Sequence, residues 1–258
     1  MPPDAVNQQA DSALPEISVV VPVHNEAENI EPLVEEIRAA LAGRRHEILY
    51  VDDGSTDDSL SILLALAARF PELRVLSHQS SCGQSTAIRT GVKAARAPWV
   101  ATLDGDGQND PADIPLLLEL MDDPHRPEAL KLINGHRHQR KDTWVKRVSS
   151  KVANFVRRSL LHDDTPDSGC GLKLFHRQAW LDLPFFDHIH RFTPALFLAA
   201  GHEVRSVKVH HRPRTRGKSK YGIHNRLWVG IVDLFGVMWL LRRTTRPRLR
   251  PLAESDPR

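Results

Sequence analysis

Short apolar runs alternate with helical segments over the first part of the chain. The runs with the length and β-branched content of buried strands are residues 17–21, 47–51, 73–76 and 100–103. The segments that repeat apolar residues at helical spacing are residues 27–41, 59–70 and 83–95, the first of them through Ile30, Leu33, Val34, Ile37 and Leu41. Four strands alternating with three helices predict βαβ units and a parallel sheet.

The pattern continues less regularly beyond the fourth strand. It predicts helices at 113–121, 144–161 and 191–200, strands at 129–134, 172–175 and 203–210, and loops at 163–171 and 212–221. We therefore expect one domain over residues 16–222, after a polar, disordered tail at residues 1–15. Pro22 is expected to end the first strand.

An apolar segment at residues 227–241 contains one charged residue, Asp233. Its helical stripe consists of Leu227, Ile231, Leu234, Phe235, Met238 and Leu241. Fifteen residues span roughly 22 Å as a helix, which is short of the ~30 Å hydrocarbon core. With tryptophans inside it and arginines on both sides, the segment predicts an amphipathic helix at 223–245 in the interface of an anionic membrane, followed by a basic tail at 246–258. A helix docked on the domain's own core, or a dimer contact, is the alternative.

Charge is divided unevenly along the 258 residues, although the net charge is only +3. Residues 1–136 hold 10 basic and 22 acidic residues, and residues 137–258 hold 25 basic and 10 acidic residues. This division suggests a metal in the acidic half that faces anionic substrates. Cys82 and Cys170 form no CxxC pair, which argues against a zinc site or disulfide framework and fits a reducing compartment. The pairs His188/His190 and His210/His211 show no metal-ligand spacing and are interpreted as surface or loop residues.

Carboxylates follow three of the predicted strands. Asp104 and Asp106 end the fourth strand among glycines, Asp52 and Asp53 end the second, and Glu26 follows the first. Carboxyl ends of parallel strands meet at one edge of a sheet, where open α/β sheets bind ligands. Mg²⁺ takes one or two carboxylates plus substrate phosphates, so the Asp-x-Asp pair suggests a metal that grips a diphosphate, with an ordinary Asp-Gly turn as the alternative. Neither GxGxxG nor a P-loop is present.

These motifs resemble family 2 glycosyltransferases of the GT-A fold. The matching stretches are Val-Val-Val-Pro-Val-His-Asn-Glu at 19–26, Val-Asp-Asp-Gly-Ser-Thr-Asp at 51–57 and Leu-Asp-Gly-Asp-Gly-Gln at 103–108. Within the family, residues 16–222 are most similar to polyprenyl-phosphate sugar synthases of the dolichol-phosphate mannosyltransferase type. The resemblance implies an α/β fold with a Rossmann-like, mostly parallel sheet flanked by helices.

The resemblance also assigns roles to individual residues. The positions that match nucleoside contacts are Pro22, His24, Glu26, Val51 and Asp53, with His24 where the family usually has Tyr or Phe. The positions that match the metal site are Asp104, Asp106 and Gln108, with Asp106 the expected direct ligand. Arg137 and Arg147 match arginines that face substrate phosphates, and Arg214 and Lys220 match a mobile loop that closes over the donor. Asp167 to Gly171 matches an Asp-x-x-Ser-Gly loop with Cys170 in place of Ser, and Thr193 replaces a family lysine.

The resemblance implies a metal-dependent, inverting transfer of a sugar from a nucleotide-diphosphate sugar. The donor would be GDP-mannose or a UDP-sugar, the cofactor Mg²⁺ or Mn²⁺, and the acceptor a polyprenyl phosphate. A phosphate acceptor is already anionic and needs no strong base, whereas a sugar hydroxyl would need one, for which Asp167 is the candidate. We expect a cytoplasmic protein that is peripheral on the inner face of the membrane, with a membrane-protein partner or a dimer also possible and nucleic acid excluded as a partner.

Two other functions remain open at this point. One is a glycosyltransferase that acts on a hydroxyl of a glycan or glycolipid. The other is a non-catalytic, membrane-docked nucleotide-sugar binder. A processive polysaccharide synthase is disfavoured, because the sequence contains no Gln-x-x-Arg-Trp motif.

Overall fold

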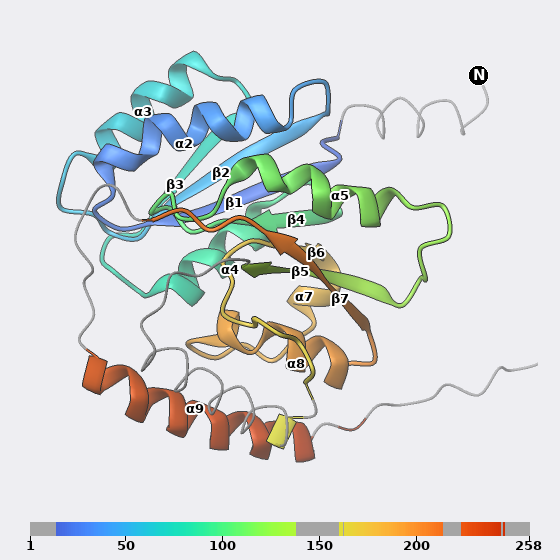
Figure 1. Cartoon of the computed structure of the whole chain (residues 1–258). Coiled ribbons are helices and arrows are strands. Elements are labelled where there is room, and N and C mark those ends of the chain that lie inside the picture. The colour runs from blue at the N-terminus through green and yellow to red at the C-terminus, as the bar shows by residue number, and fades with distance from the viewer. Residues whose placement is uncertain (1–13, 138–159, 162, 214–222, 244, 246–258) are drawn as a thin grey trace, which may run out of the picture.

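A seven-stranded sheet forms the centre of the computed structural model, which describes residues 14–137, 160–161, 163–213, 223–243 and 245 (Figure 1). The strands are β1 (Ile17–Val23), β2 (His46–Asp52), β3 (Leu73–Ser77), β4 (Trp99–Thr102), β5 (Leu130–Arg137), β6 (Lys173–His176) and β7 (Glu203–Val209). Their order across the sheet is β3-β2-β1-β4-β6-β5-β7. Every neighbouring pair is parallel except the two that involve β6. The predicted mostly parallel α/β sheet is confirmed.

Helices cover both faces of this sheet and enclose two apolar clusters (Figure 1). One face carries α2 (Ala27–Ala40), α3 (Ser59–Arg69) and α5 (Ile114–Asp122), which follows a short 3-10 turn at Pro111–Asp113. The other carries α4 (Gln84–Ala94), α7 (Arg177–Leu181), α8 (Thr193–Ala199) and α9 (Ile223–Arg243). The predicted apolar face of α2 is confirmed, since Ile30, Leu33, Val34, Ile37 and the following Leu41 are all buried.

The prediction that β1 stops at Pro22 is wrong, because the strand continues through Pro22 to Val23. Pairing between β1 and β4 ends at Val20 and Thr102, so β1 has only β2 beside it at Pro22. A proline lacks a backbone N–H and is tolerated where one side of a strand needs no ladder bond. β1 can therefore run on and deliver His24 to the edge of the sheet.

Strand β6 is antiparallel to β4 and β5, and Lys173 at its start lies opposite Thr102 at the end of β4. The residues that precede β6 therefore arrive at the same edge of the sheet as the residues that follow β4. Apolar periodicity predicted this strand but not its direction, because a buried strand has the same sequence pattern whether it is parallel or antiparallel to its neighbours.

Helix α9 packs one face on the domain and exposes another. Val237 is buried, and Leu234, Met238 and Leu241 pack around it against the cluster formed with α4, α7 and α8. Val232, Phe235 and Trp239 are 65%, 62% and 62% exposed. The predicted single apolar stripe is thus divided, because Phe235 faces outward while Leu234, Met238 and Leu241 face the core. No described helix combines the length and apolar character needed to cross a membrane.

Two predictions of local structure lie largely outside the described residues. They are the helix at 144–161, of which the structure describes residues 160–161, and the basic loop at 212–221, of which it describes 212–213. The helix predicted at 191–200 is shorter, because Ile189–Arg191 forms a 3-10 turn and α8 begins at Thr193, just before Pro194. A proline in the first turn of a helix loses no intrahelical hydrogen bond.

Candidate active site

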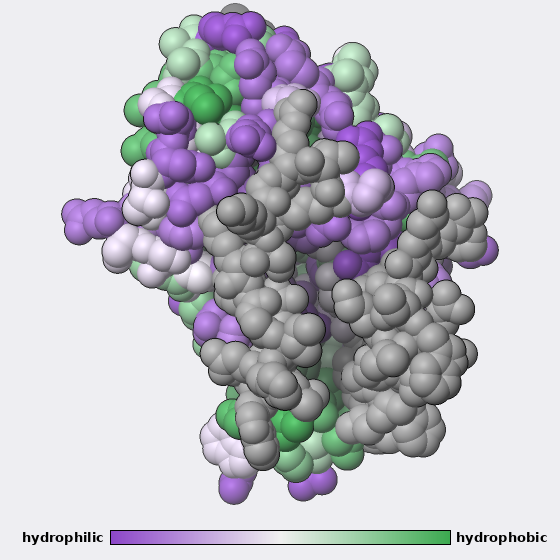
Figure 2. Space-filling view, turned by 60° about the vertical axis from the view of Figure 1, so that its left-hand side comes forward, coloured by the Kyte–Doolittle hydropathy of each residue, from purple (hydrophilic) through white to green (hydrophobic). Residues whose placement is uncertain are grey.

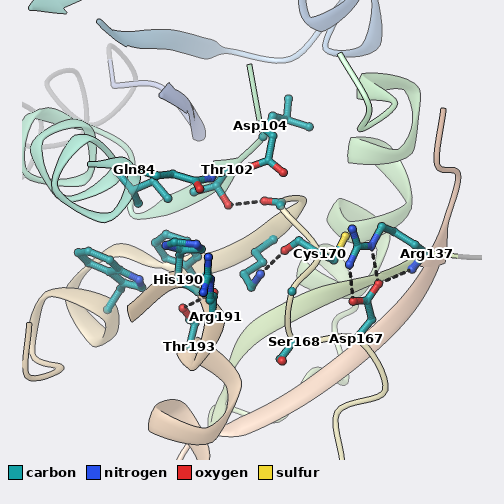
Figure 3. Close-up of a pocket in the computed structure, with 17 residues that line it drawn as sticks. Gln84, Thr102, Asp104, Arg137, Asp167, Ser168, Cys170, His190, Arg191 and Thr193 are labelled. Atoms are coloured by element: carbon teal, nitrogen blue, oxygen red, sulfur yellow. Dashed lines mark hydrogen bonds and ion pairs between the residues drawn. The ribbon is translucent and has the colours of Figure 1, made fainter. Parts of the chain in front are cut away.

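An open pocket of about 590 Å³ lies where β4 ends and β6 begins. Asp104 and Gln84 lie along one side of it, His190 and Arg191 along the other, and Arg137 with Asp167 at one end (Figure 3). Ile88, Phe175 and Trp180 add apolar lining. The volume is within the usual range for small-ligand sites, and the mixture of an apolar wall with a few charged groups is typical of them.

Asp104 places a carboxylate in this pocket, in surroundings that disfavour its ionised form. Burial, and next the negative charge of Asp106, raise the pKa of Asp104 to about 6. Its Oδ1 accepts a hydrogen bond of 2.7 Å from the side-chain amide of Gln84, at the first residue of α4. The neighbouring Asp106 accepts from the backbone N–H of Gln108 at 3.1 Å, which orders the turn. Asp104 and Asp106 thus lie close enough for their charges to interact, and Gln108 contacts Asp106 through its backbone N–H.

Gly171 permits the close approach of the loop before β6 to Asp104. A Cβ at this position would overlap the Asp104 carboxylate and lie 2.6 Å from the side-chain oxygen of Asn109. The same Asn109 oxygen accepts from the backbone N–H of Asp104, and the Gly171 carbonyl accepts from the hydroxyl of Thr102. The absence of a side chain at Gly171 is thus a condition for this geometry.

Arg137 and Asp167 form a two-pronged ion pair (Figure 3). The guanidinium Nε and Nη2 each donate to one carboxylate oxygen at 2.7 Å, and the backbone N–H of Arg137 donates at 3.2 Å. Burial alone would raise the pKa of Asp167, but the hydrogen bonds and charge of Arg137 outweigh it and lower that pKa. Asp167 is therefore a weak base, with both oxygens already engaged.

The other acidic strand end serves a different purpose. Asp53 is 4% exposed, and its carboxylate accepts hydrogen bonds from the N–H groups of Cys82 and Gly83, the hydroxyl of Ser81 and the ring of His78, at 2.7–2.9 Å. Burial would raise the pKa of Asp53, but these bonds lower it. Its carboxylate thus fastens the loop before α4 to the end of β2.

Asp52 and Gly54 complete this connection. The carboxylate of Asp52 accepts from the N–H of Ser55 and the hydroxyl of Ser77. Gly54 has a φ of +65°, and a Cβ there would overlap the backbone of Ser80. Protein donors therefore stabilise the carboxylates of both Asp52 and Asp53.

The remaining nucleoside positions surround the same strand ends. The Nδ1 atom of His24 lies 2.8 Å from the carbonyl oxygen of Asp53, and the backbone N–H of Glu26 donates to Ser59. Val51 and Pro22 are buried and paired across β1 and β2, so their side chains belong to the core. Of these four positions, His24 and Glu26 can therefore offer a side chain to a ligand, whereas Pro22 and Val51 can offer only backbone atoms.

The sequence interpretation missed several residues of the pocket, among them Gln84, Lys173, His190 and Arg191. His190 lines the pocket and hydrogen-bonds to Ser85 at 2.7 Å, so its interpretation as an ordinary surface or loop residue is wrong. Burial, together with the charges of Arg191 and Lys173, lowers the pKa of His190 well below its usual value and keeps it neutral. A signal existed for Lys173, a lysine within an apolar strand, whereas no periodicity marks Gln84 or His190.

The remaining predicted residues are divided between described and undescribed parts of the chain. Arg147, Arg214 and Lys220 lie outside the described residues. Thr193, which stands where the family has a lysine, is buried and donates to the carbonyls of Ile189 and His190. Among the described residues, three ligand-type side chains converge at Asp53, His78 and Cys82, where hydrogen bonds account for the arrangement, and not at Asp104 and Asp106.

Comparison with known proteins identifies the family. Residues 18–182 match the model of glycosyl transferase family 2. The chain belongs to this family. The glycosyltransferase is 36% identical over 238 residues to a dodecaprenyl-phosphate galacturonate synthase of Rhizobium johnstonii, covering 90% of this chain and 69% of the relative. It is 33% identical over 216 residues to an undecaprenyl-phosphate 4-deoxy-4-formamido-L-arabinose transferase of an Enterobacter species, covering 81% of this chain and only 63% of that relative.

Solved structures confirm that the glycosyltransferase has the GT-A fold. A mannosyltransferase of Pyrobaculum calidifontis, solved with GDP-Man and Mn²⁺, superposes with a TM-score of 0.66 at 20% identity, covering 92% of this chain and 67% of that one. A glucosyl-3-phosphoglycerate synthase of Mycobacterium tuberculosis, solved with Mn²⁺, UDP and glucosyl-3-phosphoglycerate, gives 0.62 at 21% identity, covering 90% and 81%.

Proposed function

We propose that the protein transfers a sugar, with inversion and with the help of a divalent metal, from a nucleotide-diphosphate sugar to a polyprenyl phosphate at a membrane surface. The names of the two relatives given above share a polyprenyl phosphate but differ in the sugar. Their similarity to this chain therefore supports the class of acceptor more strongly than the identity of the donor sugar. The chain spans less than two thirds of the arabinose transferase, and the proposal concerns the part present here.

The metal fits Asp104 and Asp106. Burial and, after it, the charge of Asp106 raise the pKa of Asp104 to about 6, and a cation bound between the two carboxylates would stabilise the ionised Asp104. Oxygen ligands suit Mg²⁺ and Mn²⁺, with substrate phosphates completing the shell. When bound, the metal would stabilise the charge that develops on the departing diphosphate.

The ion pair of Arg137 and Asp167 is the observation that favours a phosphate acceptor over a hydroxyl acceptor. A hydroxyl acceptor needs a base, but both oxygens of Asp167 accept from Arg137 and its pKa is lowered. A phosphate acceptor is already ionised near pH 7 and needs no base. Asp167 then holds the guanidinium plane of Arg137, whose remaining N–H groups are available to a phosphate. The alternative of a sugar-hydroxyl acceptor is weakened for the same reason.

The other assignments extend this arrangement. Arg147 would join Arg137 on the acceptor phosphate, and Arg214 and Lys220 would close over the donor diphosphate. His24, Glu26 and the strand-end backbone at Pro22 and Val51 would hold the nucleoside. Asp53 would hold the loops around it in place, because four protein donors already occupy its carboxylate.

The outer face of α9 is the proposed contact with an anionic membrane. Val232, Phe235 and Trp239 are exposed on it, and Arg242 and Arg243 follow at its end. Figure 2 shows hydrophobic residues gathered at the lower end of the molecule, where α9 lies in Figure 1, while the upper part is mostly hydrophilic. Aromatic side chains with adjacent arginines suit the headgroup region of anionic lipids. A peripheral protein on the cytoplasmic side of the membrane would meet both substrates there.

The decisive experiment is a screen of GDP- and UDP-sugars with purified enzyme, Mn²⁺ or Mg²⁺, and undecaprenyl phosphate. Sugar label in the organic phase would support the proposal. Transfer only to glycan or glycolipid hydroxyls would favour the alternative acceptor, and nucleotide-sugar binding without any transfer would favour a non-catalytic binder.

Membrane contact is tested separately by sedimentation with liposomes that contain phosphatidylglycerol. The double variant Phe235→Ser/Trp239→Ser should reduce binding roughly tenfold, because it removes two large apolar side chains from the proposed contact. Leu64→Ser is the matched control, since Leu64 is also exposed but lies on α3 on the opposite face of the sheet. Equal binding of all three proteins would refute the assignment to α9.

A further inference from the structure

Two basic side chains in the pocket, those of Lys173 and Arg191, form no direct ion pair with a carboxylate among the described residues. Lys173 is 5% exposed, and its ammonium group donates a hydrogen bond to the carbonyl of Cys170. Arg191 is half-buried on the pocket wall next to His190, and no described ion pair includes it (Figure 3). A buried charge is unfavourable unless it is paired, so this arrangement points to a ligand group that carries negative charge.

The other charged groups of the pocket are already engaged. Arg137 is paired with Asp167. Asp104 lies close enough to interact with Lys173, but the proposed metal would neutralise it. His190 is held neutral and accepts or donates at Ser85, so it offsets neither cation. With donor and metal in place, Lys173 and Arg191 remain as an excess of positive charge.

We propose that Lys173 and Arg191 form a subsite for an oxyanion on the transferred sugar, namely the carboxylate of a uronic acid. This inference rests on the proposed function. A diphosphate held at Asp104 would direct its sugar into the pocket, whose volume of about 590 Å³ accommodates a monosaccharide. Trp180 and Phe175 provide an apolar wall for the face of the sugar ring. An acceptor phosphate carries similar chemistry, but Arg137 already serves it at the other end of the pocket.

Matched pairs of donors test the subsite, because each pair differs only in the carboxylate. The pairs are UDP-glucuronate with UDP-glucose, UDP-galacturonate with UDP-galactose, and GDP-mannuronate with GDP-mannose. We expect the uronate of the preferred pair to exceed its neutral counterpart at least tenfold in kcat/KM with undecaprenyl phosphate. Binding constants from calorimetry in the presence of Mn²⁺ read the same preference without turnover.

Variants then assign the preference to the two cations. Arg191→Gln and Lys173→Met should each lower kcat/KM for the uronate roughly tenfold or more and leave the neutral donor within about threefold. Arg205→Gln is the matched control, since Arg205 pairs with Glu203 on the surface of β7. If Lys173→Met fails to fold, Arg191→Gln alone decides the result.

Three outcomes would overturn the inference. They are a preference for neutral donors, an equal loss for both members of a pair, and a rise in KM for undecaprenyl phosphate with every donor, which would assign the cations to the acceptor phosphate. A lack of product from every donor would instead contradict the proposed function, while the calorimetric preference would still decide the subsite.

Discussion

Two acidic strand ends lie on either side of β1, and the protein treats their carboxylates in opposite ways. After β2, four donors from the loop before α4 surround Asp53 and lower its pKa. After β4, burial and the nearby Asp106 raise the pKa of Asp104 to about 6. Two aspartates at the same edge of the sheet thus have different roles: Asp53 holds a loop in place, whereas Asp104 forms a candidate metal site. The number of hydrogen-bond donors that the protein provides differs: four reach Asp53, whereas Gln84 donates to Asp104.

The largest effect is expected from Asp106→Ala. Loss of the expected metal ligand should lower kcat roughly a thousandfold, because stabilisation of the leaving diphosphate is lost, while Tm stays within about 2 °C of the wild type. Steady-state transfer with saturating Mn²⁺ and a thermal melt measure the two effects. Asp122→Ala, which removes a surface partner of Arg44, is the control. Near-normal turnover of Asp106→Ala would contradict the metal assignment.

A smaller loss of activity is expected from Gly171→Ala. The added methyl group would displace the Asp104 carboxylate, and misplacement by about 1 Å at a reacting centre lowers rates on the order of a hundredfold. Transfer rates and Mn²⁺ titrations would reveal weaker metal binding together with the lower rate. Gly236→Ala on α9 provides the comparison, because nothing lies within 4 Å of a Cβ there. Unchanged kinetics for Gly171→Ala would mean that this close approach is irrelevant to catalysis.

Asp53→Asn should act on stability. The amide N–H₂ would face N–H donors from the loop before α4, so we expect the free energy of unfolding to fall by about 2 kcal/mol. The folded-state pKa of Asp53 lies below its unfolded value of 3.8, so its contribution is present above that pH and disappears as the pH falls through the folded value. Urea unfolding should therefore show a large difference at pH 7 that shrinks below about pH 4.

The exposed Asp58, whose side chain makes no capping hydrogen bond, provides the control for this substitution. Asp58→Asn should change stability by less than about 0.5 kcal/mol. If Asp53→Asn were as stable as Asp58→Asn yet had lost nucleotide binding, Asp53 would be a ligand contact and the contrast between the two strand ends would disappear.

The smallest effect concerns pH and Asp104. Because a carboxyl group must be ionised to bind a metal, a pKa of about 6 implies that Mn²⁺ affinity falls about fourfold between pH 7.5 and 5.5. Calorimetric titration at the two pH values measures this change. Asp104→Asn should bind more weakly and with little dependence on pH in this range, whereas an equal dependence in both proteins would assign the titration to another group.

The sheet and the metal-site candidates could be predicted from the sequence because their signals are local. Apolar runs and helical periodicity located β1 to β4 and the helices between them, and the two aspartates of residues 104–106 stand directly after a strand. The opposite roles of Asp53 and Asp104 could not be predicted in this way. They depend on Cys82, Gly83 and Gln84, which are about thirty and twenty residues away from these aspartates in the chain, and on how that loop folds back.

The pocket itself also depends on long-range pairing. His190 and Gly171 line the same pocket as Asp104 because β6 is placed between β4 and β5, and the sequence of a four-residue strand shows neither its direction nor its neighbours. The division of α9 into a packed and an exposed face has the same cause. Both of its faces are apolar in sequence, and only the position of the domain decides that Leu234 is covered and Phe235 is not.

The reversed strand β6 sets limits on how this site can diversify. Lys173 and Phe175 line the pocket from alternate positions of β6, so one residue inserted between them would turn Phe175 to the opposite face of the sheet from Lys173. A two-residue slip would keep the face but carry the lysine roughly 7 Å along the strand, beyond reach of the same ligand. Residues 163–169, which precede the strand as a loop, can change in length at far lower cost. Changes in this loop can thus alter which substrates bind, while the pairing of β6 with its neighbours keeps Lys173 in its place in the pocket.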